Sequence, residues 1–263
     1  MKTFKIGGVH PHDSKISKDC AIEDFPVLEK AYLSMAQHLG APAEPIVQKG
    51  DKVKVGQLIA KPTGFVSANI HSSVSGTVAA VEPYADLAGN PVMHVIIDVE
   101  GDEWEESIDR TPDVVRDITL SKEEIIKRIQ DCGIVGLGGA SFPTHIKLTP
   151  PPGKVAEYLL INGAECEPFL TSDYRLMIEQ PEQVLIGAKI MMKALDVKKC
   201  RFGVEENKPE AIAKLKSFSA QYPEIEIVPL KKKYPQGGEK QLIEALTGRR
   251  VPSMGLPIDA GAV

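Results

Sequence analysis

Cysteine is scarce in this chain and is never clustered. The four cysteines are Cys20, Cys132, Cys166 and Cys200, at least 34 positions apart and without a C-x-x-C pair. Structural zinc sites, disulfide frameworks and iron–sulfur sites use closely spaced or paired cysteines. We therefore expect no metal site and no iron–sulfur cluster within these residues, and a reducing, cytoplasmic setting.

The sequence also lacks a long apolar segment and an excess of positive charge. It has no run of about 18 apolar residues, as a membrane-spanning helix requires, and its first residues do not resemble a signal peptide. The net charge is −5, which argues against nucleic acid or an anionic membrane surface as a direct partner. We interpret the basic run Lys231–Lys233 as a solvated strand end. The length of 263 residues favours two globular domains.

The first 40 residues are expected to form an N-terminal segment with one helix. That helix would run from Phe25 to Leu39, with Pro26 near its start and Gly40 as its stop. Proline is favoured in the first turn of a helix, and glycine is favoured just after the last.

Residues 41–110 read as short strands and turns. Lys49–Ile59 predicts turn, strand, turn, strand, and Ile70–Val81 predicts two strands around a Ser-Gly turn. The two stretches together resemble the barrel-sandwich hybrid of biotinyl and lipoyl carrier domains. The lysine that carriers modify would fall at Phe65, and the nearest lysine, Lys61, is out of register. A structural module is therefore favoured over a carrier of biotin or lipoate.

Residues 111–263 alternate between helix and strand. The predicted helices are 121–132, 181–195, 209–219 and 239–246, and the predicted strands are 158–161, 200–204 and 225–230. The first helix opens with a capping box at Ser121–Glu124, and two others open with proline. This alternation predicts an α/β fold, with helices on the faces of a mostly parallel sheet. Ligands of such sheets bind beyond the carboxyl ends of the strands.

A glycine-rich stretch, Gly136–Lys147, precedes the first of these strands. Three glycines within four positions let a flat or phosphorylated ligand approach the backbone. Pro143 and Thr144 could begin a helix whose free N–H groups face an anion. The stretch matches neither a Walker loop nor G-x-G-x-x-G, and on its glycines alone a mobile turn is an equal alternative.

Two further loops combine acidic residues with glycine after a predicted strand. Asn162–Pro168 carries Glu165 and Glu167, whose carboxylates can accept from ribose hydroxyls, ring N–H groups or a carboxamide. Single acids in loops are usually solvated, so this stretch alone would be weak. Tyr234–Glu239 repeats the pattern with an aromatic residue, glycines and an acid. Three such loops at one sheet indicate a binding site.

Residues 136–147, G-x-G-G-A-x-F-P-T-x-x-K, resemble the flavoprotein subunit of respiratory complex I, where this motif lies against FMN and NADH. That family has N-A-D-E-G-E-P after the next strand, and Asn162–Pro168 is similar to it. The chain also contains F-x-x-G-G-V-H-P (residues 4–11), I-N-G-A-E-C-E-P-F-L-T-x-D-x-R (residues 161–175) and V-E-E-N-K-P-E-A-I (residues 204–212). With Leu137, these are similar to the RnfC subunit of the Rnf electron-transport complexes, and the resemblance covers essentially the whole chain.

The resemblance implies a role for each residue of the three loops. The backbone wall beside the isoalloxazine would be formed by Gly136, Gly138, Gly139 and Ala140. Phe142 would stack near the nicotinamide or adenine, and Lys147 would place a positive charge near the flavin or nucleotide. Asn162 and Glu165 would hydrogen-bond the flavin side, and Glu167 would contact NADH. The pocket would be closed by Tyr234, Gly237, Gly238 and Glu239.

Two residues depart from the complex I pattern, both in ways associated with the Rnf branch. Ala164 stands where that family has aspartate, which removes one polar contact to the flavin. Leu137 stands where it has arginine.

The function that the resemblance implies is hydride exchange between NAD(H) and non-covalently bound FMN, within an ion-translocating ferredoxin:NAD⁺ oxidoreductase. Its partners would be the other membrane subunits and the ferredoxin-side subunit, at the cytoplasmic face of the bacterial inner membrane. No side-chain acid or base is required for hydride transfer, so no catalytic residue is assigned. The alternative is a non-flavin assembly or quinone-side protein, similar to the A subunit of the sodium-pumping NADH:quinone reductase, which lacks the glycine-rich flavin loop.

The resemblance also places some expected features after Val263. The 4Fe–4S clusters would lie there, together with a V-N-N-V-x-T segment whose asparagines and threonine hold the flavin phosphate in the relatives. Each lost charged hydrogen bond costs about 1.5–3 kcal/mol. We therefore expect residues 1–263 alone to bind FMN weakly, which a fluorescence titration beside a longer chain would test.

Overall fold

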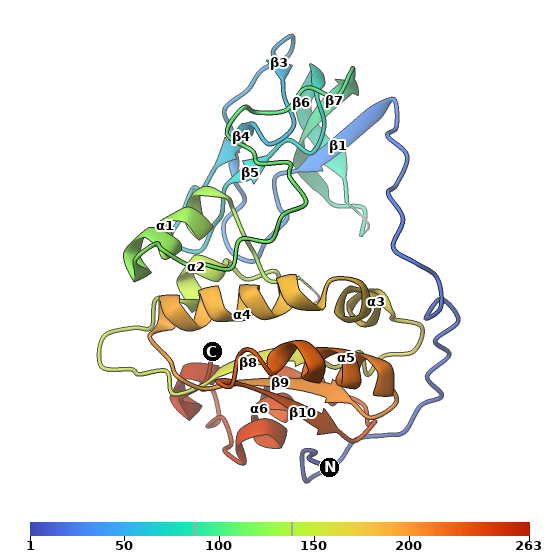
Figure 1. The fold of residues 1–263 in the computed structure, drawn as a ribbon. Coiled ribbons are helices and arrows are strands. Elements are labelled where there is room, and N and C mark those ends of the chain that lie inside the picture. Colours follow the sequence, from blue (N-terminus) through green and yellow to red (C-terminus); the bar gives the residue numbers. More distant parts are fainter. Residues whose placement is uncertain (87, 138) are drawn as a thin grey trace. The chain divides into compact units, whose positions relative to one another are not determined.

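The computed structural model describes residues 1–86, 88–137 and 139–263. They form two compact units, each assembled from separate stretches of the chain (Figure 1). The α/β unit comprises Met1–Asp24, Val114–Lys122 and Pro150–Val263, and the β unit comprises Phe25–Asp113 and Glu123–Thr149. The domain boundaries expected near residues 40 and 110 stay predictions.

The β unit contains two antiparallel sheets. One has the strand order β1-β7-β6-β3 and the other the order β2-β4-β5. Their bounds are β1 Lys30–Ser34, β2 Glu44–Pro45, β3 Lys52–Val53, β4 Leu58–Lys61, β5 Ile70–His71, β6 Gly76–Ala85 and β7 Pro91–Val99. Apolar side chains from both sheets, Met35, Ile59, Val95 and Ile97 among them, form one buried core. The predicted all-β module is thus confirmed, and Phe65, at the carrier-lysine position, is exposed between β4 and β5.

The helix predicted for Phe25–Leu39 is wrong, because this stretch contains strand β1. The strand pairs antiparallel with β7, from Lys30 opposite Asp98 to Ser34 opposite His94. Leu33 and Met35 both pack into the core, which is the two-residue spacing of a strand. Tyr32 points away from them and its ring lies 4.8 Å from that of Tyr84. Pairing with a strand 60 or more residues away overrides the local helix signals.

Helix α1 (Lys122–Asp131) begins where the capping box predicts and carries Ile125 and Ile129 on its buried side. Its last carbonyl groups are bound by a side chain of the β module, because Asn69 Nδ2 donates to the carbonyl oxygens of Gln130 and Asp131 at 3.3 and 3.0 Å. These bonds satisfy acceptors that the helix leaves open. The short helix α2 (Thr144–Lys147) follows in the same unit.

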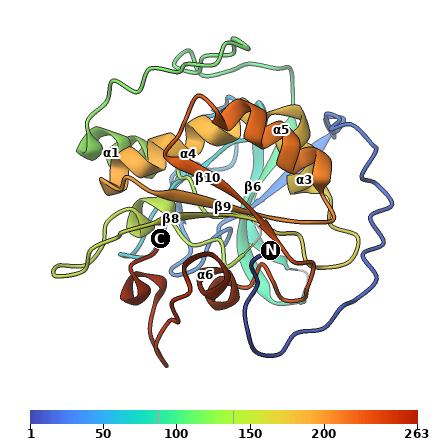
Figure 2. The ribbon, with the colours of Figure 1, turned by 60° about the horizontal axis from the view of Figure 1, so that its bottom comes forward.

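The α/β unit is built on a parallel sheet of β8 (Leu159–Gly163), β9 (Cys200–Glu205) and β10 (Ile225–Leu230), in the order β10-β9-β8. Helices α3 (Ser172–Glu179), α4 (Pro181–Leu195) and α5 (Pro209–Ser219) cover one face, and α6 (Glu239–Thr247) covers the other (Figures 1 and 2). A 3₁₀ turn, η1 (Pro257–Ala260), lies near the end of the chain. The predicted α/β fold with a parallel sheet is confirmed.

The helix ends in this unit follow their proline and glycine signals. Helices α4 and α5 begin at Pro181 and Pro209, as predicted. Helix α6 ends at Gly248, which has the left-handed φ of 76° that glycine adopts without strain. No helix in the described ranges of the chain is long and apolar enough to cross a membrane.

Cys200 is sealed inside this sheet and should be chemically inert in the folded protein. It is 1% exposed, and its burial, with a smaller contribution from the charge of Glu224, raises the pKa of its thiol to about 12. Only the thiolate alkylates, and at pH 8 it is populated roughly a thousandfold less than at the ordinary pKa. Iodoacetamide followed by mass spectrometry should therefore modify the exposed Cys20 and Cys132 first. Equally fast modification of Cys200 would show that β9 opens readily.

Candidate functional site

The three parallel strands end at one edge of the α/β unit, and two of the three predicted loops meet there. We call residues 162–171, which begin with the last two residues of β8, the acidic loop. Residues 231–238, after β10, are the glycine loop, which is distinct from the glycine-rich loop Gly136–Lys147. Asn162 joins them, because its Nδ2 donates to the carbonyl oxygen of Gly237 at 2.9 Å. Its Oδ1 accepts from the N–H of Ala164 at 3.1 Å, within the acidic loop.

Gly237 is placed where no larger residue fits. A Cβ at this position would lie 2.8 Å from the carbonyl oxygen of Ala164 and 3.4 Å from Asn162 Oδ1. Its N–H donates to the thiol of Cys166 at 3.4 Å. The close approach of the two loops therefore explains this glycine directly.

The other predicted residues of the glycine loop lie around this contact. Tyr234 is exposed, and its backbone pairs with Val9. Gly238 precedes helix α6, and Glu239 is the exposed first residue of that helix. They surround one edge of the sheet, and their roles toward a cofactor stay predictions.

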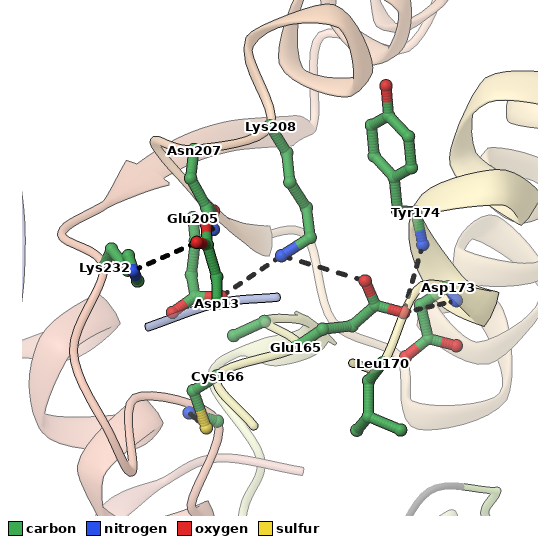
Figure 3. Close-up of polar contacts among 12 residues, drawn as sticks. Asp13, Glu165, Cys166, Leu170, Asp173, Tyr174, Glu205, Asn207, Lys208 and Lys232 are labelled. Carbon is green, nitrogen blue, oxygen red and sulfur yellow. Dashed lines mark hydrogen bonds and ion pairs between the residues drawn. The ribbon is translucent and has the colours of Figure 1, made fainter. Parts of the chain in front are cut away.

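Glu165 and Glu167 differ in burial. Glu167 is exposed, whereas Glu165 is only 3% exposed. Glu165 Oε1 accepts from the N–H of Asp173 at 2.7 Å and from the N–H of Tyr174 at 3.3 Å, as Figure 3 shows. Glu165 thus caps the start of helix α3 from outside the helix, and its expected contact with the flavin stays a prediction.

A buried lysine, Lys208, lies between two buried carboxylates (Figure 3). Its Nζ donates to Glu205 Oε2 at 3.2 Å and lies 3.8 Å from Glu165 Oε2. The three side chains are at most 4% exposed. Isolated charges at such depth are strongly unfavourable, so each carboxylate depends on the ammonium group. Within the described residues, Glu165 Oε2 and Glu205 Oε1 accept no hydrogen bond, so Lys208 is their nearest compensation.

This cluster was missed in the sequence. Glu205 and Lys208 lie in the V-E-E-N-K stretch, which served only as a mark of resemblance. Their position at and just after the end of a buried strand was the available signal, because residues there face the ligand edge of a parallel sheet.

A cavity of about 200 Å³ opens beside the cluster within the α/β unit. Its walls include Glu165, Lys208 and Asn207, together with Lys15, Lys18, Tyr174 and Glu210. Tyr174 Oη donates to Glu210 Oε2 at 2.9 Å. Burial, followed by this hydrogen bond and the charge of Glu210, raises the pKa of the Tyr174 phenol. The phenol therefore stays protonated near neutral pH.

The glycine-rich loop Gly136–Lys147 belongs to the β unit. The N–H of Gly136 donates to the carbonyl oxygen of Phe142 at 3.0 Å, which closes the loop at its base. Ala140 is exposed, and a Cβ on Gly139 would meet no atom of the chain within 4 Å. Packing within the protein therefore does not demand glycine at position 139. Gly138 lies outside the described residues.

The helix after this loop has few N–H groups left for an anion, and the expected anion site there stays a prediction. Helix α2 has only four residues. The N–H of Thr144 donates to the carbonyl oxygen of Ile134 at 3.0 Å, and those of Ile146 and Lys147 donate to Pro143 at 3.2 and 3.4 Å. These donors are used inside the protein. The Nζ of Lys147 lies 2.6 Å from the position that a Cβ on Gly136 would take, and its expected role near the flavin or nucleotide stays a prediction.

Two protein-family models match this chain. Residues 2–102 match the RnfC barrel sandwich hybrid domain, and residues 129–263 match the Nuo51 FMN-binding domain. The first covers the antiparallel sheets of the β unit. The second covers the glycine-rich loop and the parallel sheet with both of its edge loops.

Several curated proteins are similar to the chain along its whole length. It is 48% identical to the C subunit of the proton-translocating ferredoxin:NAD(+) oxidoreductase complex of Clostridium ljungdahlii, over 100% of this chain and 57% of that protein. It is 45% identical to the C subunit of the Na(+)-translocating complex of Acetobacterium woodii, over 99% of this chain and 58% of that protein. The chain thus spans a little over half the length of these relatives, and the resemblance read from its motifs is confirmed. The chain belongs to the RnfC family of Rnf-type complexes, with an RnfC barrel sandwich hybrid domain followed by a Nuo51 FMN-binding domain.

Proposed function

We propose that this chain is the NADH- and FMN-handling part of an ion-translocating ferredoxin:NAD⁺ oxidoreductase. The observation that carries the proposal is the meeting of the acidic and glycine loops at the carboxyl edge of a parallel sheet. Dinucleotides and flavins bind at this edge in open α/β sheets. The match of this half of the chain to an FMN-binding domain supports the same conclusion.

The residues present fit a flavin in two respects. Gly139 is a glycine that the protein's own packing does not require, as expected where a flat ring approaches the backbone. Asn162, exposed at the end of β8, and Glu167, exposed beyond it, offer an amide and a carboxylate, groups suited to ring N–H, carbonyl and ribose hydroxyl partners. When bound, FMN would accept the hydride of NADH and release its electrons singly.

In this proposal the chain's own residues orient and enclose the reactants. Gly136, Gly138, Gly139 and Ala140 leave room for the ring, Phe142 stacks on a base, and Lys147 balances negative charge. Asn162 and Glu165 lie on the flavin side of the site. Glu165 acts there through its buried carboxylate and through its hydrogen bond to the start of α3. Glu167 contacts NADH, and Tyr234, Gly237, Gly238 and Glu239 close the pocket.

We further propose that the chain works beside other Rnf membrane subunits and a ferredoxin-side subunit, as a peripheral protein at the cytoplasmic face of the membrane. The relatives' names describe them as subunits of translocating ferredoxin:NAD(+) oxidoreductase complexes. The alternative, a non-flavin protein similar to the A subunit of the sodium-pumping NADH:quinone reductase, is disfavoured by the intact G-x-G-G-A-x-F-P-T stretch. A visible spectrum of the full-length subunit with and without added FMN tests the proposal, and absence of a flavin spectrum after reconstitution would refute it.

Replacing Glu167 by glutamine in the full-length subunit should weaken NADH binding by about 1–3 kcal/mol, which is roughly tenfold to a hundredfold in dissociation constant. The carboxylate is exposed at the strand edge, where it can accept from the nucleotide. FMN content should stay near normal. The measurement is NADH titration with flavin absorbance recorded on the same sample.

Glu23→Gln is the control, because it removes the same charge from another exposed residue of the α/β unit. It should leave NADH affinity within about twofold of the original value, since exposed charges without direct contact contribute little. An empty flavin site with unchanged NADH affinity in Glu167→Gln would show that the roles of the two acids are reversed.

A further inference from the structure

We propose that Lys15 is a positioning residue of the dinucleotide site, because its ammonium group holds the backbone of the acidic loop in place. This inference rests on the proposed function. Lys15 lies some 150 residues before the loop in sequence, yet its Nζ donates to the carbonyl oxygens of Glu165, Glu167 and Leu170 at 2.8, 2.8 and 2.7 Å.

Three hydrogen bonds use every hydrogen that an ammonium group has. They draw together three carbonyl groups spread over six residues, much as a bound cation would. Bonds from a charged donor are about twice as strong as neutral ones. The residues between β8 and α3 belong to no helix or strand, so their carbonyl groups have no regular hydrogen-bond ladder. The hydrogen bonds from Lys15 fix this backbone in its place.

The residues around Lys15 hold the same loop along its length. The N–H of Phe169 donates to the carbonyl oxygen of Asp13 at 3.0 Å, and Ser17 Oγ lies 2.7 Å from Thr171 Oγ1. The Asp13 carboxylate also accepts from Asn207 Nδ2 at 3.1 Å, and Lys232 Nζ lies 3.5 Å from it (Figure 3). Residues 13–17 therefore contact the loops that follow all three strands.

The backbone of the acidic loop needs such support. Phe169 has a φ of +70° and is 59% exposed. A left-handed conformation is unfavourable for a bulky residue and persists only where the surroundings impose it. The contacts from Asp13, Lys15 and Ser17 impose it on both sides of Phe169.

Lys15 acts on the ligand through Glu167. The carbonyl group of Glu167 is one of the three anchors, so Lys15 fixes the backbone from which the exposed carboxylate projects. The ammonium hydrogens are all directed at the loop, which leaves none to bind a phosphate directly. Loss of Lys15 should therefore weaken NADH binding by misplacing Glu167, with little effect on the turnover of bound NADH.

The test uses Lys15→Met, Lys15→Arg and Lys18→Met in the full-length, FMN-loaded subunit. Lys18 is the control, because it lies on the same segment, lines the same cavity and is exposed. Arginine keeps the charge but presents a planar fork, which cannot direct three hydrogens from a single nitrogen to three separate carbonyl groups as an ammonium does. The readouts are amide hydrogen exchange of residues 165–171, the dissociation constant of NADH, kcat with an artificial electron acceptor, and the melting temperature.

In Lys15→Met we expect exchange in the loop to rise about tenfold or more and NADH affinity to fall about tenfold, with kcat changed by less than about threefold. Lys15→Arg should recover only part of each loss, and Lys18→Met should match the unsubstituted protein. Full recovery by arginine, or an equal loss in Lys18→Met, would mean that Lys15 acts by attracting the anionic nucleotide, and would overturn the proposal. Unchanged loop exchange in a folded Lys15→Met protein would overturn it too.

The NADH measurements distinguish a failure of the proposed function from a failure of the positioning role. If the FMN-loaded subunit binds no NADH, the proposed function is wrong and the positioning role is wrong with it. If it binds NADH and Lys15→Met binds equally well, only the positioning role is wrong.

Discussion

Replacing Lys208 by methionine should lower the free energy of unfolding by about 3–5 kcal/mol, the usual cost of removing one partner from a buried ion pair. Glu165 and Glu205 are both almost fully buried, and Lys208 is the cation that lies between them. Without it, the two buried carboxylates lose the only ammonium group within 4 Å of them among the described residues, and the more distant charge of Lys15 replaces it only in part. Urea denaturation followed by circular dichroism measures the difference.

Two further variants sharpen this test. Lys214→Met replaces an exposed lysine on the adjacent helix α5 and should change stability by less than about 0.5 kcal/mol. Adding Glu205→Gln to Lys208→Met removes one of the two unpaired buried charges and should recover part of the lost stability. A loss below about 1 kcal/mol in Lys208→Met would show that water or a proton already compensates the carboxylates.

A single methyl group at position 237 should separate the two loops of the site. In Gly237→Ala the new Cβ would meet the carbonyl oxygen of Ala164 at 2.8 Å, which is backbone and cannot rotate away. Such overpacking costs about 1–3 kcal/mol of stability. Misplacement of binding groups by about 1 Å lowers rates about a hundredfold. We therefore expect a modest fall in melting temperature and a much larger fall in NADH-dependent reduction of an artificial acceptor by the full-length subunit.

Gly187→Ala supplies the comparison. Gly187 lies within helix α4, and a Cβ there would meet no atom within 4 Å. Alanine should stabilise this helix by about 0.5–1 kcal/mol, because it loses less backbone entropy than glycine. If both alanine variants behave alike, the contact between Gly237 and Ala164 does not limit the site.

Sequence alone was sufficient for elements whose signals are local. Helices α4 and α5 begin at the prolines that predict them, and α6 ends beside Gly248. Helix α3 was not predicted, because the carboxylate that caps it belongs to Glu165, outside the helix. Strand β1 was predicted as a helix because its partner lies far along the chain. Local patterns cannot report such distant partners.

The same distinction between local signals and distant partners applies to the candidate site. Its loops were recognisable because glycine and acidic residues have restricted uses after a parallel strand. The burial of each side chain could not be predicted. Glu165 and Glu167 are the same residue type in the same loop, yet Glu165 is buried and Glu167 is exposed. The contribution of Lys15 could not be inferred, because nothing near it in sequence indicates its three carbonyl partners.

The path of the chain through its two units also orders events during synthesis. Lys2 pairs with Leu230, and Lys15 binds carbonyl groups between residues 165 and 170. Residues 1–24 therefore cannot form these contacts until segments much later in the chain have been translated. At roughly 5–20 residues per second, the wait for Leu230 lasts on the order of ten seconds or more. All of the β unit, up to Thr149, leaves the ribosome in that interval and can fold first. Residues 1–24 are thus made well before the segments that order them, so we expect them to be accessible to proteases and chaperones during that part of translation.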